Sequence, residues 1–438
     1  MKNINLISIF FFIFNFVGAS SLEATQFFKS DILNKPDVVS SYVVLDQNRP
    51  NNYQARDLYL SEGFFQYPAL NQHYRLDTGD IEDNSFQIDN QKNIHMAWAK
   101  TQHFDNGVPV GSFEYAELMK GNFSNVLVRE NIYKALTGSR GLASDLELAE
   151  NNGQQNPIVA ILHTDYSGSG VHEILQLGIR QSANNWRIIP LWDSVNAQGN
   201  FYPSVELSLK HIINPSTGQK VTVGGSVAVN LSTCTIISCN SNLYIVDFDM
   251  ATFTPNMTSV SAAHYVASTF GGLHTITLGE NAATFFTVGS SPEGIYRVFK
   301  SGSWLPPVYA ARQGNDYDSY TSTLSGGTLS YIVASEQGSN NNFELNYYLF
   351  ANNGFFGKFP IASTQPGSGE SFLNVAVDGS SPVTSLVPGA VLVFRNISAN
   401  SQSLEVFRYN ATSWQKMTLR AFLGSSFSIE EPNVKIYK

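Results

Sequence analysis

An all-β fold, and within it a β-propeller of seven four-stranded blades, is predicted by three features of this 438-residue sequence. Short runs of alternating or β-branched apolar residues follow one another along the chain, separated by Gly, Asn, Ser and Pro, as is typical of strands and turns. These runs recur in groups of four. The two chain ends hold complementary parts of one further group.

Each complete group has its four runs in the same order, as expected for propeller blades, which bury both faces only by stacking on neighbours. The five clear groups are 85–89, 93–98, 113–118 and 123–128; 145–150, 157–162, 172–177 and 186–190; 273–279, 282–288, 295–300 and 304–308; 320–326, 329–335, 343–348 and 356–361; and 372–378, 391–396, 404–409 and 414–419. A weaker group occupies about 203–260, with 243–248 as its clearest strand.

The chain ends predict the seventh blade. Near the N-terminus, 41–46, 55–60 and 64–67 match the last three runs of a group, and 427–438 is a lone strand at the C-terminus. Pairing the two ends completes the group and removes a fraying edge. Two tandem β-sandwiches are the alternative. They explain the strands, but neither the constant order nor the incomplete ends.

The N-terminal residues predict export. Lys2 precedes an apolar run over 4–17, which ends in small residues around Ala19. This pattern is typical of a secretory signal peptide cut near Ala19, and the run is too short to span a bilayer. We therefore expect a signal peptide over 1–19, a single propeller domain over 20–438, and a secreted protein that is extracellular or periplasmic.

Composition narrows the class of partner. The chain is 43% hydrophobic and only 14% charged, which excludes a disordered protein and a coiled coil. Its 26 basic and 35 acidic residues give a net charge of −9, so nucleic acid and anionic membranes would be repelled. No membrane insertion is expected. The predicted partner is a glycan or an extracellular protein, and the predicted state is a monomer.

Cysteine and carboxylate patterns give two further expectations. Cys234 and Cys239 are the only cysteines, and in an oxidising compartment they predict a disulfide that clamps one loop. No metal spacing is present among the histidines. Asp77, Asp80 and Asp83 could together hold Ca²⁺, but a solvated acidic turn is favoured, so no cofactor is predicted.

The common catalytic motifs are absent. The sequence has no Gly-x-Ser-x-Gly, no His-Glu-x-x-His and no phosphate-binding Gly-rich loop. In a propeller, ligands gather where fourth-to-first connections cross from the rim to the axis. Aromatic, acidic and amide side chains there suit sugars. The ligand-binding candidates on these connections are Tyr74, Arg75, Asp77, Arg140, Asp193, His264, Arg312, Tyr317 and Asp318.

Three turns carry a family resemblance. The segments 182–186, 301–304 and 410–414, each ending in Trp, resemble the aspartate-box turn of the sialidase-like (BNR/Asp-box-type) β-propeller superfamily, and 89–98 is similar to a second strand of such blades. The resemblance implies a propeller whose Trp residues plug the outer blade layer. No turn keeps the boxed aspartate.

The resemblance also implies the alternative function, a sialidase-like glycoside hydrolase. That chemistry requires an arginine cluster, for which Arg75, Arg140 and Arg312 are the candidates, with a Tyr–Glu nucleophile pair and an acid. No catalytic residue can be carried over from the family, because the motif around its first arginine is missing. A lectin-like binding module is therefore favoured over an enzyme.

Overall fold

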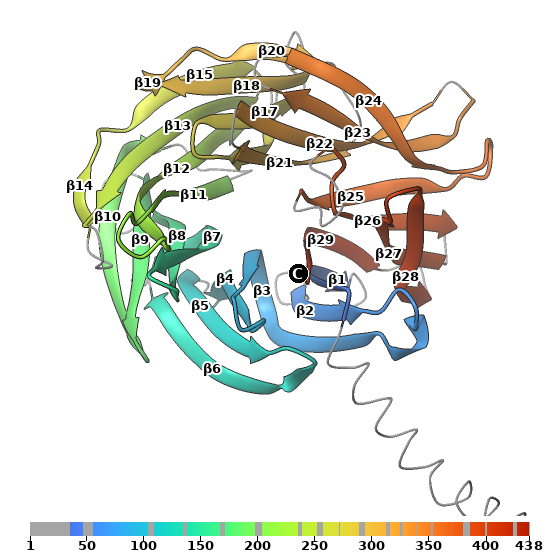
Figure 1. Ribbon diagram of the computed structural model, residues 1–438, viewed down its shortest axis with the longest axis horizontal. Helices are drawn as coiled ribbons and strands as arrows, with labels where there is room; N and C mark the ends of the chain where they lie inside the picture. The colour runs from blue at the N-terminus through green and yellow to red at the C-terminus, as the bar shows by residue number, and fades with distance from the viewer. Residues whose placement is uncertain are drawn as a thin grey trace, which may run out of the picture.

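The protein is an all-β molecule whose sheets are arranged around a common centre, as a computed structural model shows (Figure 1). The structure describes residues 36–46, 56–103, 109–134, 138–166, 171–197, 204–234, 239–251, 257–270, 272–288, 294–311, 316–324, 327–338, 340–351, 354–379, 386–398, 401–423 and 427–437. Within these ranges, no helix has the length and apolar character that crossing a membrane requires. The predicted signal peptide lies outside them.

The strands follow the predicted order along the chain. The first half contains β1 (Val38–Asp46), β2 (Arg56–Gly63), β3 (Gln72–Ile88), β4 (Ile94–His103), β5 (Pro109–Met119), β6 (Asn122–Lys134), β7 (Ser139–Asn151), β8 (Gln154–Asp165), β9 (Val171–Ser182), β10 (Asn185–Ala197), β11 (Ser204–Ile213), β12 (Lys220–Cys234), β13 (Cys239–Met250), β14 (Met257–Val260) and β15 (His264–Phe270). The second half contains β16 (Gly272–Leu278), β17 (Ala282–Val288), β18 (Gly294–Ser301), β19 (Ser303–Trp304), β20 (Val308–Ala311), β21 (Asp316–Leu324), β22 (Gly327–Gln337), β23 (Phe343–Ala351), β24 (Gly354–Ser363), β25 (Ser371–Asp378), β26 (Ala390–Ser398), β27 (Ser401–Tyr409), β28 (Trp414–Leu423) and β29 (Phe427–Ile436).

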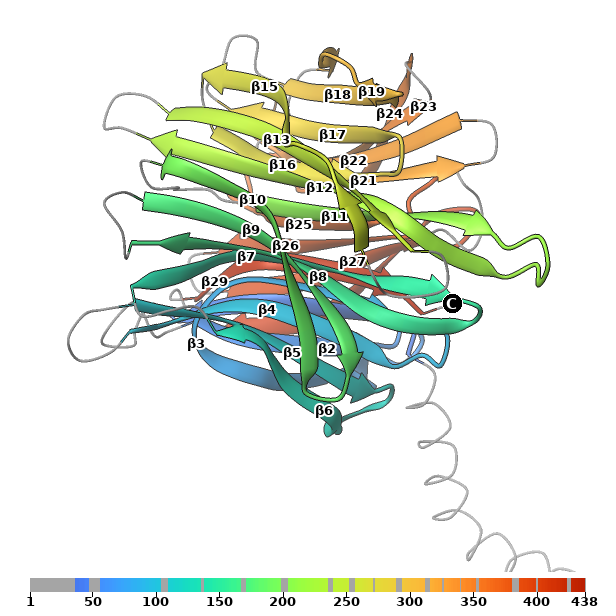
Figure 2. The same ribbon diagram turned by 90° about the vertical axis from the view of Figure 1, so that its left-hand side faces the viewer.

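Antiparallel four-strand groups are the unit of this fold. The strands β21 to β24 and β25 to β28 form two separate sheets in sequence order, and β16 to β19 lie in a third, in which β20 also pairs with β18. The remaining strands belong to one large sheet that includes the series β7 to β10. Seen from the side, successive sheets stack face to face around the centre (Figure 2).

The long strand β3 corrects one prediction. Its first half pairs with β2 from Arg56↔Gly79 to Glu62↔Gln72, and its second half pairs with β4. The outer strand beside β2 is therefore the start of β3, and not 64–67 as the sequence predicted. Pro68 begins a short 3-10 helix, Pro68–Leu70, which separates the aromatic run from the strand.

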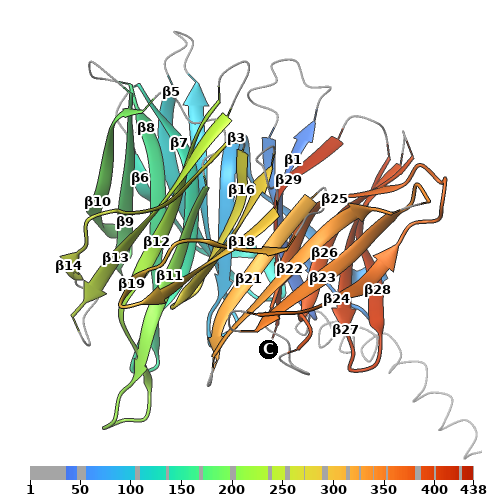
Figure 3. The ribbon, with the colours of Figure 1, turned by 90° about the horizontal axis from the view of Figure 1, so that it is seen from above.

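The two chain ends lie side by side. The strand β29 pairs antiparallel with β1 from Val38↔Ile436 to Asp46↔Phe427, with one irregularity in the register (Figure 3). The side chain of Asn374 on β25 donates to the carbonyl of Ile429 on β29. The pairing of the chain ends that the sequence predicts is thus present.

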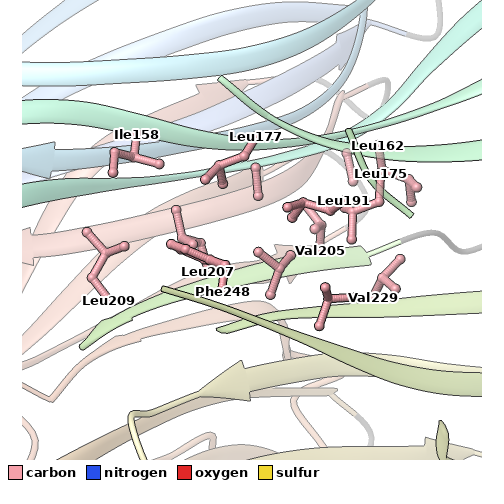
Figure 4. Close-up of a cluster of buried hydrophobic side chains, with 14 of the residues drawn as sticks. Ile158, Leu162, Leu175, Leu177, Leu191, Val205, Leu207, Leu209, Val229 and Phe248 are labelled. Carbon is pink, nitrogen blue, oxygen red and sulfur yellow. The ribbon is translucent and has the colours of Figure 1, made fainter. Parts of the chain in front are cut away.

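The core lies between neighbouring sheets. One cluster joins the sheet of β7 to β10 with β11 to β13 through fully or nearly fully buried aliphatic side chains and Phe248 (Figure 4). Alternate residues of β8 divide between two such layers, because Leu162 faces this cluster and Ile161 faces the cluster next to β5. Both faces of β8 are therefore covered by neighbouring groups, since successive side chains of a strand point to opposite faces.

The Trp residues of the three box-like turns pack into the structure. The indole of Trp186 donates to Glu130 at 2.7 Å, Trp304 is 4% exposed and donates to Asp247, and Trp414 contacts Tyr347. Trp304 is thus a buried plug, as predicted, whereas Trp186 and Trp414 are only partly buried. Cys234 and Cys239 are register partners on β12 and β13. Their side chains lie outside those described, so the disulfide stays a prediction.

Candidate functional site

The face where fourth strands lead to the next first strand carries a compact group of charged side chains near the centre. Arg56 begins β2, Asp80 and Glu82 lie in the middle of β3, Arg140 lies near the start of β7, and Glu430 lies on β29. We call these five residues the axial charge cluster. Of the predicted ligand-binding residues whose side chains the structure describes, only Arg140 belongs to it.

Glu82 links the two arginines. Its Oε1 accepts from Nε and NH2 of Arg140 at 2.9 and 2.8 Å, and its Oε2 accepts from NH1 of Arg56 at 3.0 Å. The Glu82 side chain is 9% exposed, whereas that of Arg140 is 42% exposed. Burial raises the pKa of Glu82, and the two guanidinium groups oppose that effect only in part.

Arg56 bridges three carboxylates. Besides Glu82, its guanidinium lies 3.2 Å from Glu430 and 3.6 Å from Asp80. Tyr166 follows β8 and is 46% exposed, and its hydroxyl lies near enough to Arg140 to act on it electrostatically. Burial lowers the pKa of the Arg140 guanidinium, but Glu82, Asp80 and the Tyr166 hydroxyl raise it, and the net shift is upward. The axial charge cluster and the neighbouring Tyr166 therefore provide guanidinium donors, carboxylate acceptors and one phenol ring.

Close backbone approach positions Arg140. The strands β5 and β7 touch in parallel at Val110↔Ser139. A Cβ at Gly111 would lie 2.4 Å from the Gly141 nitrogen, so only glycine fits there. This contact fixes the start of β7 against the neighbouring group and holds Arg140 beside β3.

Three other predicted residues lie away from the cluster. Tyr74, Arg75 and Asp77 lie on the outer half of β3 and not on a connection at the mouth. Arg75 pairs with Asp57 at 3.4 Å. Asp77 accepts from Lys100 at 3.1 Å, from the Trp98 indole at 2.9 Å and from Arg129 at 3.2 Å. These contacts join β3 to β4 and β6, which indicates a structural role for Asp77.

Of the remaining predicted residues, the structure describes the side chains of Asp193 and His264, which lie on different strands. Asp193 accepts from His172 at 3.1 Å on an exposed part of β9 and β10. His264 is exposed at the start of β15. Arg312 lies outside the described residues, as do the side chains of Tyr317 and Asp318 on β21.

An aromatic row lies next to His264 and consists of Trp192 on β10, Tyr244 on β13 and Tyr265 on β15. The ring of Tyr244 contacts Trp192 at 4.8 Å and Tyr265 at 5.6 Å between centroids. Trp192 and Tyr244 pack on the core below, and Tyr265 is 51% exposed.

The three aspartates considered for Ca²⁺ do not share partners. Asp77 pairs with Lys100 and Asp80 with Arg56, whereas Asp83 accepts from the backbone N–H groups of Ser144 and Asn84 at 2.8 and 2.7 Å. Cations or donors of the protein already occupy each carboxylate, so the described contacts give no support to a shared calcium site.

No protein-family model and no curated protein matches the sequence. Similar solved structures include the Aleuria aurantia lectin in complex with α-methyl-L-fucoside, with TM-score 0.39, 10% identity and coverage of 78% of this chain and 96% of the lectin. A PL25 ulvan lyase gives TM-score 0.42 and 11% identity over 89% and 94% of the two chains. The Penicillium chrysogenum α-L-arabinanase complexed with arabinobiose gives TM-score 0.36 and 10% identity over 79% of this chain and 83% of the arabinanase. These similarities are low, and no conclusion about this chain rests on them.

Proposed function

We propose that this chain is an exported, lectin-like β-propeller that binds an uncharged glycan over the axial charge cluster, without chemistry. One observation supports this proposal above the others. Arg140 is half-exposed while Glu82 holds it from beneath, so its outer N–H groups are oriented donors. Such fixed donors beside carboxylate acceptors and an exposed Tyr166 ring suit the hydroxyl groups and C–H faces of sugars.

The charge balance of the cluster favours a neutral ligand. When all five side chains are ionised, two guanidinium groups and three carboxylates leave a net charge of −1. An acidic sugar would meet no unopposed positive charge there. The chain as a whole is acidic as well, with a net charge of −9, which adds a weaker repulsion of anions.

The ring of seven blades is part of the proposal. Contacts between first strands support it: β3 packs against β7, β7 against β11, β11 against β16, β16 against β21, β21 against β25, and β25 against β29, which also meets β3. Export is a second part, because the predicted signal peptide lies outside the described residues. N-terminal sequencing of protein secreted by an expressing host tests it, and the expected first residue follows Ala19.

A glycan array with the mature chain tests the binding function. Neutral glycans are expected to be retained selectively, and Arg140→Ala should weaken the affinity at least tenfold. Arg75→Ala is the matched control, because Arg75 also pairs with one carboxylate but lies on the outer strand. Equal losses in both variants, or an array without any bound neutral glycan, would contradict the proposal. Binding to an extracellular protein instead would favour the other class of partner.

The alternative function is a sialidase-like hydrolase, and an activity assay distinguishes it from a binding module. It requires arginines that converge on one carboxylate of the sugar. Arg75 and Arg140 lie in separate ion-pair groups, each already opposed by a carboxylate. Turnover of a fluorogenic sialoside by the mature chain would reverse the ranking.

A further inference from the structure

Three metal-ligating side chains converge on the face opposite the axial charge cluster, where hairpins join first strands to second strands. Asp89 lies in the turn after β3, His95 is the second residue of β4, and Glu117 lies on β5. One ligand atom from each lies within 4.8 Å of the other two. His95 and Glu117 are direct register partners, so their side chains lie on the same face of the sheet.

The imidazole of His95 is held in a fixed orientation. The residue is 5% exposed, its Nδ1 lies 2.6 Å from the Tyr115 hydroxyl, and its Nε2 lies 3.1 Å from Asp89 Oδ2. Histidines that ligate metals use one ring nitrogen for the ion and donate the other N–H to a neighbouring group. Two ligands at about 2.0–2.2 Å from a tetrahedral Zn²⁺ lie roughly 3.3 Å apart, close to the observed separation.

A hydrogen bond explains why Asp89 and His95 lie together. It does not explain why the carboxylate of Glu117 lies beside them. Among the described residues, no hydrogen bond or ion pair engages the Glu117 carboxylate. Arg180, on which Glu117 acts electrostatically, gives its Nε and NH2 to Glu130 at 3.1 and 2.7 Å. A second carboxylate is therefore held beside Asp89 without a cation bonded to it, and a divalent ion would balance both charges.

We propose that Asp89, His95 and Glu117 bind one Zn²⁺, which joins the 89–93 turn to β4 and β5. An imidazole in the ligand set favours zinc over calcium, which prefers six to eight oxygen ligands. Water completes the coordination. The site lies away from the axial charge cluster, so it is independent of glycan binding.

Zinc titration of the full mature chain tests the site. Untagged protein is first treated with a chelator, and Zn²⁺ affinity is then measured by competition with a chromogenic chelator at pH 7.5. One ion per chain is expected, and Glu117→Gln should weaken its affinity at least tenfold. The wild type should also melt at a higher temperature with Zn²⁺ than without it, and this rise should disappear in Glu117→Gln.

The Asp193–His172 pair provides the matched control. It has the same 3.1 Å separation as Asp89–His95 but is exposed. His172→Gln should leave the zinc affinity unchanged. The proposal is wrong if no single tight site is found, if Glu117→Gln binds zinc as the wild type does, or if His172→Gln removes the binding. Glu117 takes no part in the hydrogen bonds that link Asp89, His95 and Tyr115. An effect of Glu117→Gln on zinc affinity therefore distinguishes a metal site from a purely structural hydrogen-bond network.

Discussion

Buried carboxyl groups in this protein differ in what accompanies them. Glu173 and Glu405 are each the second residue of a third run, at 172–177 and 404–409, so the sequence pattern does not distinguish them. The structure gives Glu405 the cations Arg395 and Lys416, each at 3.3 Å. Glu173 is 1% exposed, and its Oε1 has no hydrogen-bond partner among the described residues. A charge on Glu173 is therefore costly, whereas a charge on Glu405 is compensated.

Glu173→Gln is expected to stabilise the protein above neutral pH. Burial raises the pKa of Glu173 from 4.5 to about 7. The folded state thus keeps a proton that the unfolded chain has already released, so stability falls as pH rises from about 4.5 to 7. Removing the carboxyl should raise the free energy of unfolding by about 1–3 kcal/mol at pH 8 and have little effect at pH 4.5.

Urea midpoints of wild type and variant at the two pH values measure this difference. Glu344→Gln is the control, because Glu344 occupies the equivalent third-strand position in another group but is only partly buried. A gain for Glu173→Gln that is the same at both pH values would show that ionisation is not its cause.

At the scale of the element, the start of each outer strand is a plug in some groups and a surface residue in others. The sequence predicts Trp304 and Phe356 as equivalent starts of fourth runs. The structure buries Trp304 to 4% exposure against the β16 to β18 group, with its indole on Asp247, but leaves Phe356 67% exposed on β24.

Trp304→Ala is expected to lower the free energy of unfolding by about 3–5 kcal/mol, because it empties a packed site and removes an indole hydrogen bond. Phe356→Ala should change that free energy by no more than about 0.5 kcal/mol, as is usual on an exposed surface. Chemical denaturation followed by circular dichroism measures both. Comparable losses in the two variants would contradict the assignment of Trp304 as a plug.

Element prediction succeeded where a continuous apolar run indicates a strand that is buried on both faces. The second strand β8, for example, is buried on both sides, and the sequence places its ends within three residues. It failed at the outer strand next to β2. There the sequence predicts a strand at 64–67 because these residues are mostly aromatic, whereas the strand begins at the polar stretch Gln72–Arg75. An outer strand buries only part of its surface, so its sequence need not be apolar.

The candidate site was less predictable than the fold for a related reason. Arg140 stands on a connection that the four-run order identifies. Its partner Glu82 lies 58 residues away, and Glu430 reaches Arg56 from the other end of the chain. Those contacts depend on which groups are neighbours around the centre and on the twist of each strand, and no local pattern encodes either. Asp89, His95 and Glu117 were missed similarly, because their spacing matches no metal motif and only the β4–β5 register brings them together.

At the scale of the whole molecule, buried polar side chains connect first strands that no backbone ladder joins. The carboxylate of Asp83 on β3 accepts from the Ser144 N–H on β7, and that of Asp145 on β7 accepts from the Leu207 N–H on β11. Asn84 donates to the Glu431 carbonyl on β29 at 2.9 Å. These hydrogen bonds fix neighbouring groups relative to one another at the centre, where side chains from several groups must meet in register to form the axial charge cluster.

The C-terminal strand is expected to be essential for the stability of the whole chain. Ile429, Val434 and Ile436 of β29 are 0%, 2% and 4% exposed, and each contributes about 1.5–3 kcal/mol on burial. Their sum, roughly 5–9 kcal/mol, is comparable with the entire stability of an ordinary domain. Deleting 427–438 would also leave β1 with an unpaired edge. The truncated chain should therefore lose its cooperative unfolding transition and aggregate.

A synthetic peptide of residues 427–437 distinguishes a missing strand from a general defect of the truncated chain. Since β29 makes its contacts through the β1 register and through side chains from β25 and β3, the peptide should fill the vacant position in trans and restore cooperative melting. A scrambled peptide of the same composition should not. A truncated chain that melts like the full-length protein would contradict both the importance of β29 and the proposed closed ring of blades. If the truncated chain has no cooperative melting transition and neither peptide restores one, β29 acts during folding and not as a replaceable strand of the folded protein.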